Sequence, residues 1–246
     1  MDYTTVASSD WHLGGGDDAD DSNVAGLLRI FDYWRKYIKP TDIVLVGDIF
    51  ERWQFSLVDI VESKRTFFAQ MNNLLKETHA TIHVVKGNHD GKGTEVFDTL
   101  TEQLKDLHVV DHQFHYVQND WLFLHGHQWD KVNSGGPKQV FAHGMTWVAG
   151  VIERIIPGFP VDYLNPESWV SPAHDTNVSV RGDIAAEVLR AAAQCGQKIC
   201  YGHTHEADLA RDQRVVNCGC CVGEEADFVI IFPDGTVNLQ SLKEAA

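Results

Sequence analysis

The sequence predicts an α/β fold built around a sheet that helices cover on both faces. Apolar strands alternate with helical patterns up to about residue 112, and the strand at 42–46 is an almost unbroken apolar run. Strands that are apolar along their whole length are typical of sheets buried on both faces. The chain has 246 residues, 43% of them hydrophobic, which suits one large domain or one domain with an insertion.

The elements of the first half follow from hydrophobic periodicity and from capping residues. A β-prone strand at 4–8 is followed by an acidic, glycine-rich loop at 14–21, which we expect to be mobile and solvated rather than a calcium site. Ser22 is a candidate N-cap for an amphipathic helix that runs to about Ile38 and stops at Pro40. The later predicted elements are a strand at 42–46, a helix at 56–78, a strand at 81–85, a helix at 95–104 and a strand at 107–110.

After about residue 112 the alternation changes. A hairpin is predicted from strands at 114–117 and 121–124 around a polar turn. Residues 128–180 are rich in Trp and Pro without regular alternation, and we interpret them as a helical insertion within a single domain at 1–246. The remaining predicted elements are a helix at 181–195 and strands at 198–201, 215–217, 228–231 and 237–239.

Charge and cysteine usage argue against several classes of protein. The formal net charge of −15 repels phosphate backbones and anionic membrane surfaces, so broad nucleic-acid binding is disfavoured. Five cysteines, three of them at Cys218, Cys220 and Cys221, do not form a secreted disulfide framework, and we expect reduced, mostly buried thiols. Since neither a signal-like N-terminus nor an apolar run of about 18 residues occurs, we expect a cytoplasmic protein without a membrane segment.

Five predicted strand exits carry side chains of the kinds that bind metals. They hold Asp10 with His12, Asp48, Asn88 with His89 and Asp90, His125, and His203 with His205. Each group alone could be a core histidine, a helix cap or a turn, but in open α/β sheets the carboxyl ends of the strands meet at one edge. Residues two apart in an extended chain point the same way, so the first and last pairs should each present two ligands to one place. Mixed carboxylate, imidazole and amide ligands favour Mn, Fe or Zn over Ca or Mg.

In chain order the blocks are Ser9-Asp10-Trp11-His12, Gly47-Asp48-x-x-Glu51, Gly87-Asn88-His89-Asp90, His125-Gly126 and Gly202-His203-Thr204-His205. They resemble the five signature blocks of the calcineurin-like metallophosphoesterase superfamily. The resemblance implies a four-layer α/β/β/α sandwich of two mixed sheets and a site for two divalent ions. It implies that Asp48 bridges both ions, with one ion bound also by Asp10, His12 and His205 and the other by Asn88, His125 and His203. Manganese is our first choice for the ions, and Fe or Zn are the alternatives.

Three features are similar to the UDP-2,3-diacylglucosamine pyrophosphatase-like branch of this superfamily. They are the run from Gly47 to Trp53, the block His125-Gly126-His127-Gln128, and the helical insertion. The sequence departs from that branch at His89, where an Arg is expected, at His127, where an Asp is expected, and in the Cys-Gly-Cys-Cys run after Asn217. The lipid substrate of that branch is therefore one alternative among several.

The expected activity is hydrolysis of a phosphoester or pyrophosphate bond by a metal-bridging hydroxide. Two ions about 3.5–4 Å apart lower the pKa of a shared water and stabilise charge on the phosphoryl oxygens. His89 is placed to protonate the leaving oxygen or to stabilise the transition state as a cation. Glu51, favoured by the resemblance, or Asp90 would fix its tautomer. Candidate cations for the substrate phosphates are Arg52, Lys92 and Arg181.

Several functions remain as alternatives. The expected substrate is a phosphorylated small molecule or a nucleotide conjugate, which includes the UDP-2,3-diacylglucosamine type. A second alternative is a DNA or cyclic-nucleotide phosphodiesterase, although the acidic charge argues against binding of long nucleic acids. A metal-binding scaffold without catalysis is a third, but such a scaffold should have lost ligands or the acid, and the sequence retains all of them.

Overall fold

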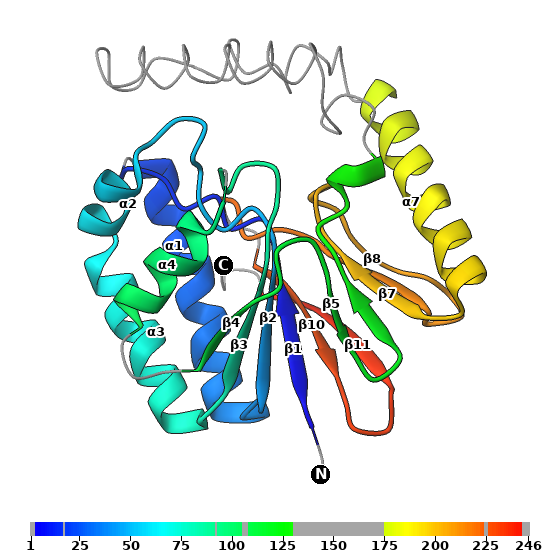
Figure 1. The fold of residues 1–246 in the computed structure, drawn as a ribbon, viewed down its shortest axis with the longest axis horizontal. Coiled ribbons are helices and arrows are strands. Elements are labelled where there is room, and N and C mark those ends of the chain that lie inside the picture. Colours follow the sequence, from blue (N-terminus) through cyan, green and yellow to red (C-terminus); the bar gives the residue numbers. More distant parts are fainter. Residues whose placement is uncertain are drawn as a thin grey trace.

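The computed structural model describes residues 3–16, 18–91, 93–104, 108–129, 175–223 and 226–242. In this part of the chain two mixed sheets pack face to face, and helices cover their outer faces (Figure 1). The layers are therefore α/β/β/α, which confirms the predicted fold class.

The first sheet has the strand order β11-β10-β1-β2-β3-β4. Its four parallel strands are β1 (Thr5–Ser8), β2 (Asp42–Val46), β3 (Thr81–Val85) and β4 (Val109–Asp111). The antiparallel strands β10 (Asp227–Ile231) and β11 (Val237–Ser241) extend the sheet beyond β1. Strands β2 and β3 coincide with the predicted ranges, because each is a buried apolar run with a glycine close behind it.

The second sheet has the strand order β5-β6-β7-β9-β8. Its strands are β5 (Tyr116–Gln118), β6 (Trp121–Phe123), β7 (Lys198–Tyr201), β8 (Ala207–Leu209) and β9 (Val215–Cys218). The predicted hairpin forms, but β5 begins two residues later than expected. Strand β8 was not predicted, since three mostly exposed residues have no hydrophobic pattern and become a strand only by antiparallel pairing with β9.

Helices cover the outer face of each sheet (Figure 1). On the first sheet they are α1 (Asp18–Tyr33), the π-helix η1 (Trp34–Ile38), α2 (Leu57–Ser63), α3 (Arg65–Thr78) and α4 (Glu95–Gln103). On the second sheet, α7 (Asp175–Cys195) packs Ile184, Val188 and Ala192 against strand side chains such as Ile199 and Tyr201. None of the helices in the described residues is long and apolar enough to cross a membrane.

Three predicted helix boundaries are wrong. The first is the start of α7, which is at Asp175 rather than at the predicted residue 181. Helix α1 begins at Asp18, so Ser22 is inside the helix rather than its cap, and the acidic run from 18 onward is helical rather than a mobile loop. Acidic residues suit this position because the first turn of a helix favours negative charge. The helix predicted at 56–78 is two helices, and the chain leaves the helical conformation at Lys64 (φ −105°, ψ 21°). The Ser56 side chain accepts the Asp59 N–H at 3.2 Å and caps the first of them.

The predicted insertion at 128–180 is described only at its ends. Residues 128 and 129 belong to the 3-10 helix η2 (His127–Trp129), and residues 175–180 form the first part of α7. Residues 130–174 lie outside the described residues, and so does the interpretation of this segment as a cap.

The core between the sheets aligns the strand ends that carry the candidate ligands. It contains Ala7, Val44, Val46 and Val85 from the first sheet and Trp121, Phe123, Cys200, Val216 and Cys218 from the second. All cysteines except Cys195 are buried, which confirms the prediction that the thiols are mostly buried.

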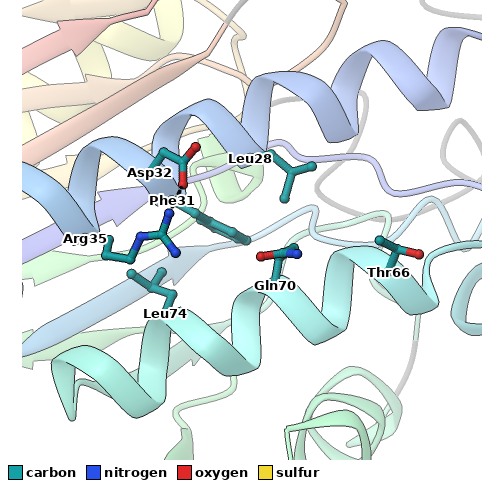
Figure 2. A pocket seen from close by; sticks show the side chains of 7 residues that line it. All are labelled: Leu28, Phe31, Asp32, Arg35, Thr66, Gln70 and Leu74. Carbon is teal, nitrogen blue, oxygen red and sulfur yellow. Dashed lines mark hydrogen bonds and ion pairs between the residues drawn. The ribbon is translucent and has the colours of Figure 1, made fainter.

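A groove of about 330 Å³ lies on the outer helical layer, between α1 and α3 (Figure 2). Phe31 and Leu74 contribute apolar surface, and the ion pair of Arg35 with Asp32 contributes charge. None of the candidate metal ligands lines this groove.

Truncation of Phe123 should show how much the core between the sheets contributes to stability. Phe123 is fully buried, so we expect Phe123→Ala to lower the free energy of unfolding by about 3–5 kcal/mol. Val117, which is 44% exposed on the neighbouring strand, provides the control, and Val117→Ala should change stability by less than about 0.5 kcal/mol. Urea denaturation of both variants measures the difference. Equal losses would contradict the assignment of the core.

Candidate metal centre

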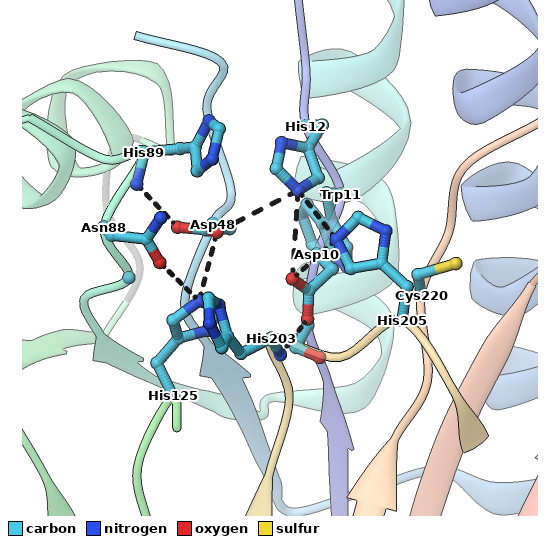
Figure 3. A network of polar contacts seen from close by, with 12 residues as sticks. Asp10, Trp11, His12, Asp48, Asn88, His89, His125, His203, His205 and Cys220 are labelled. Carbon is cyan, nitrogen blue, oxygen red and sulfur yellow. Dashed lines mark hydrogen bonds and ion pairs between the residues drawn. The ribbon is translucent and has the colours of Figure 1, made fainter. Parts of the chain in front are cut away.

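The candidate ligands meet at one edge of the molecule, beyond the carboxyl ends of β1, β2, β3, β6 and β7 (Figure 3). Two groups of the predicted ligands form there, one from Asp10, His12 and His205 and one from Asp48, His125 and His203, and a third group joins His12 to Glu51 and His89. Within each group the ligand atoms lie within 4.8 Å of one another. The structure therefore brings together residues that are up to 195 positions apart in the sequence.

In the first group the ligand atoms point toward a common centre. The Nε2 atoms of His12 and His205 are 3.3 Å apart, and His205 Nε2 is 3.2 Å from Asp10 Oδ1. Asp10 Oδ1 is buried and makes no hydrogen bond to any described residue. A buried carboxylate oxygen without a hydrogen-bond donor is costly unless a cation binds it.

The second group is arranged around the Asp48 carboxylate. His125 Nε2 lies 3.0 Å from Asp48 Oδ2 and 3.1 Å from Asn88 Oδ1. The same Asp48 oxygen is 3.9 Å from His12 Nε2, so Asp48 lies between the two groups (Figure 3). This is the position that a bridging ligand needs.

Hydrogen bonds behind the ligands orient the imidazole rings. His12 Nδ1 is 2.9 Å from Glu51 Oε2, and His125 Nδ1 donates to the Val46 carbonyl at 2.9 Å. With Nδ1 engaged in this way, Nε2 of both rings faces the carboxylates. Metal-binding histidines in proteins are held by such contacts, which fix the tautomer of the ring.

The backbone at the ligands is left-handed rather than extended. Positive φ angles occur at Asp10 (54°), His12 (43°), Asp48 (52°), His203 (73°) and His205 (58°). Non-glycine residues rarely adopt this conformation, and such residues cluster at functional sites. The expectation of extended backbone at these pairs is therefore wrong. Asp10 and His12 still belong to one group, as expected, whereas His203 and His205 contribute to different groups.

Two glycines allow the close approach of ligand segments. A Cβ atom on Gly87 would overlap Asp48 Oδ1, and a Cβ atom on Gly202 would lie 2.5 Å from Asp10 Oδ2. Any side chain at either position would displace a candidate ligand. The glycines of these blocks therefore provide space for the neighbouring carboxylates.

The donor set fits two divalent cations. Protein ligands bind such ions at about 2.0–2.2 Å, which places neighbouring ligands of one ion about 3.0–3.6 Å apart. The spacings of 3.0, 3.1, 3.2 and 3.3 Å within the two groups fall in this range. Imidazole, carboxylate and amide donors together suit a borderline metal.

Glu51 joins a candidate ligand to the candidate acid. Its carboxylate lies 2.9 Å from Nδ1 of His12 and 2.9 Å from Nδ1 of His89. Burial would raise the pKa of Glu51, but the charges and hydrogen bonds of His89 and His12 lower it to about 2. Of the two acids that the sequence offered as partners of His89, Glu51 is within hydrogen-bond distance of the ring.

Asp90 holds the backbone around the ligands. Its carboxylate accepts N–H hydrogen bonds at 2.8 Å from Asp48, Ile49 and Gly87 and at 3.0 Å from Phe50. Burial and the charge of Asp48 raise the pKa of Asp90, whereas the N–H groups of Gly87 and Phe50 oppose this. Asp90 thereby connects the turn after β2 to the turn after β3.

The three predicted substrate-binding cations do not receive equal support. Arg52 forms an ion pair with Glu95 at 2.7 Å and donates to the Phe55 carbonyl at 3.3 Å, so its guanidinium is engaged within the protein. Lys92 lies outside the described residues. Arg181 belongs to α7, and its side chain also lies outside the description.

Sequence reasoning missed Trp53. Its indole stacks on the His89 imidazole, with ring centroids 3.8 Å apart and an interplanar angle of 18°. Trp53 is the last residue of the Gly47–Trp53 run that resembles one branch of the superfamily. This resemblance was the only feature of the sequence that pointed to a role for Trp53 in the site. A tryptophan in a turn has no periodicity that could indicate its partner.

Asp90→Asn tests the structural role of this carboxylate. The asparagine amide would place its own N–H groups against backbone N–H donors, leaving buried groups unsatisfied, so we expect a loss of about 3 kcal/mol in the free energy of unfolding. Asp98→Asn on α4, whose carboxylate accepts from Thr94 in an exposed pair, is the control and should be near neutral. Thermal and urea denaturation measure both. A fully stable Asp90→Asn protein would exclude this role.

Metal binding should release protons. In the metal-free site burial lowers the pKa of both His12 and His125, but Asp10 and Glu51 raise the pKa of His12 to about 10, and Asp48 and Asp10 raise the pKa of His125 to about 9. Both rings are then protonated at neutral pH and must lose a proton to bind a cation. Affinity for Mn²⁺ should therefore rise with pH up to about 9–10.

Calorimetric titration with Mn²⁺ at pH 7, in buffers that differ in ionisation enthalpy, counts the protons released. Substitution of His115, an exposed histidine of the β4–β5 connection, should leave the count unchanged. Binding that is independent of pH would contradict the prediction.

One known protein family matches most of the chain. Residues 3–207 match the calcineurin-like phosphoesterase family. Similar solved structures include an archaeal phosphodiesterase (16% identity over 97% of this chain and 99% of that one, TM-score 0.47) and a dimetal phosphatase from Danio rerio (10% identity over 99% of each chain, TM-score 0.43). No curated protein matches the chain in sequence. Because the match spans most of the chain and every candidate ligand from Asp10 to His205, the chain belongs to the calcineurin-like phosphoesterase family.

Proposed function

We propose that this metal-dependent phosphoester hydrolase cleaves a phosphorylated small molecule or a nucleotide conjugate, with His89 as the general acid. The observation that carries the proposal is the contact of Glu51 with both His12 and His89, each at 2.9 Å. It places a candidate proton donor directly beside the candidate metal ligands. When bound, two divalent cations, with Mn as our first choice, would activate water and neutralise charge on the phosphoryl oxygens.

Residues of the chain would hold the cations and donate the proton to the leaving oxygen. The Asp48 carboxylate, fixed by the N–H of His89 at 2.8 Å, would hold the bound cations at a set distance from the acid. Glu51 keeps a proton on Nδ1 of His89, so Nε2 is the nitrogen that would donate a proton as the bond from phosphorus to the leaving oxygen breaks. His89 would then recover a proton from water. This role requires a cationic imidazole, which the Glu51 carboxylate favours.

The charge of the protein supports the choice of substrate class. With a formal net charge of −15, the chain repels long polyanions, whereas a small substrate needs favourable contacts only at the metal centre. A UDP-2,3-diacylglucosamine-type pyrophosphatase and a DNA or cyclic-nucleotide phosphodiesterase are the alternatives. Turnover of a panel with Mn²⁺ distinguishes them: p-nitrophenyl phosphate, bis-p-nitrophenyl phosphate, nucleotide-sugar pyrophosphates, a cyclic nucleotide and an oligonucleotide. A lack of turnover on every member would favour the non-catalytic scaffold.

His89→Ala tests the acid. An alkyl leaving group needs a proton in the transition state and p-nitrophenolate does not, so kcat on an alkyl phosphoester should fall about 10²–10⁴-fold and kcat on the p-nitrophenyl ester much less. Bound metal should stay at the wild-type stoichiometry. His115→Ala, an exposed histidine outside the site, is the control. Equal losses on both esters would refute an acid role for His89.

A further inference from the structure

Trp53 contacts three residues of the metal centre at once. Its indole ring stacks on His89, and its Nε1–H donates to the Asn88 carbonyl at 2.9 Å. Its backbone N–H donates to Glu51 Oε1 at 3.3 Å. One residue therefore touches the candidate acid, the partner of that acid and the backbone of a candidate ligand.

The surrounding turn holds Trp53 in place. Trp53 is 3% exposed, and Phe55 N–H donates to the Glu51 carbonyl at 3.1 Å across the turn. The neighbouring Arg52 donates its N–H to the His89 carbonyl at 3.2 Å and pairs with Glu95 at the start of α4. These bonds tie the turn that carries Trp53 to the segment that follows β3. A shift of the indole would therefore also move the segments that follow β2 and β3.

The stacking contact and the hydrogen bond constrain different motions of His89. The hydrogen bond to Glu51 limits how far Nδ1 can move but permits the ring to tilt about it. The indole face, 18° from parallel, limits this tilt and fixes the plane in which the opposite nitrogen lies. Rotation about the Cα–Cβ and Cβ–Cγ bonds would otherwise move Nε2 by an ångström or more. Misplacement of this size can cost about 10²-fold in rate.

We propose that Trp53 is a positioning residue that sets the direction in which His89 donates its proton. The proposal rests on the acid role of His89 proposed above. It predicts that the ring of Trp53 matters for poor leaving groups and has little effect on good ones. It also predicts that an aromatic ring at this position suffices for most of the effect, since the stacking contact and not the indole N–H orients His89.

A purely structural role makes different predictions. If Trp53 only packs the turn, loss of the indole would disturb Asn88, whose carbonyl accepts the Nε1–H, and would loosen the turn whose backbone N–H at position 53 donates to Glu51. Metal content would then fall, and turnover of all substrates would decline in parallel. The leaving-group dependence at full metal occupancy separates the two roles.

The experiment compares Trp53→Leu and Trp53→Phe, each alone and combined with His89→Ala, on an alkyl phosphoester and on the p-nitrophenyl ester with saturating Mn²⁺. Trp53→Leu should lower kcat on the alkyl ester about 10–100-fold, with unchanged KM and metal stoichiometry. Trp53→Phe should recover most of this loss. In the His89→Ala background Trp53→Leu should have no further effect, since residues that act through one another are not additive.

Trp121→Phe is the matched control, because Trp121 is a buried tryptophan (2% exposed) in the core between the sheets. It should lower the melting temperature without any leaving-group dependence. Parallel losses on both esters in Trp53→Leu, additivity with His89→Ala, or failure of Trp53→Phe to recover activity would overturn the positioning role. If Trp53→Leu leaves too little folded protein, Trp53→Met takes its place with the same expected leaving-group dependence, and parallel losses on both esters in that variant would overturn the positioning role.

The two proposals fail in distinguishable ways. If His89→Ala shows no leaving-group dependence, the acid role fails and the positioning role falls with it. If His89→Ala shows the dependence and Trp53→Leu does not, only the positioning role fails.

Discussion

The carboxylate of Asp48 is the constraint on which the site depends. Its Oδ2 lies between His125 and His12, and its Oδ1 accepts the N–H of His89. Burial of this carboxylate would raise its pKa, but the charges of His125, His89 and His12 outweigh burial, and the pKa of Asp48 is held well below its usual range. It is therefore ionised and ready to bind cations. The space for it exists only because position 87 is a glycine.

The proposed acid and a candidate metal ligand are connected through one further carboxylate. Glu51 contacts both His12, the candidate ligand, and His89, the proposed acid, so a change in either ring alters the electrostatics of the other. Trp53 lies against the same ring and the same carboxylate. The centre is thus a continuous set of contacts, in which effects of substitution should be strongly non-additive.

The two sheets supply different halves of this set. Strands β1, β2 and β3 of the first sheet lead to Asp10 with His12, to Asp48 and to Asn88, whereas β6 and β7 of the second lead to His125, His203 and His205. The core between the sheets sets the distance between these halves. Packing between the sheets should therefore affect the metal affinity of the proposed site, and bound cations should in turn stabilise the packed state.

The sequence by itself determined the strands that are continuous apolar runs, the fold class and the residues gathered at strand exits, because burial and strand direction are encoded locally. The resemblance already placed His203 and His205 at different ions, whereas the spacing of the two residues did not. The sequence did not determine the left-handed backbone at Asp10 and His205 or the short strand β8. The contact of Trp53 with His89 could not be inferred from the sequence either. Each of these depends on contacts between segments distant in sequence, and only the packed tertiary structure brings those segments within reach.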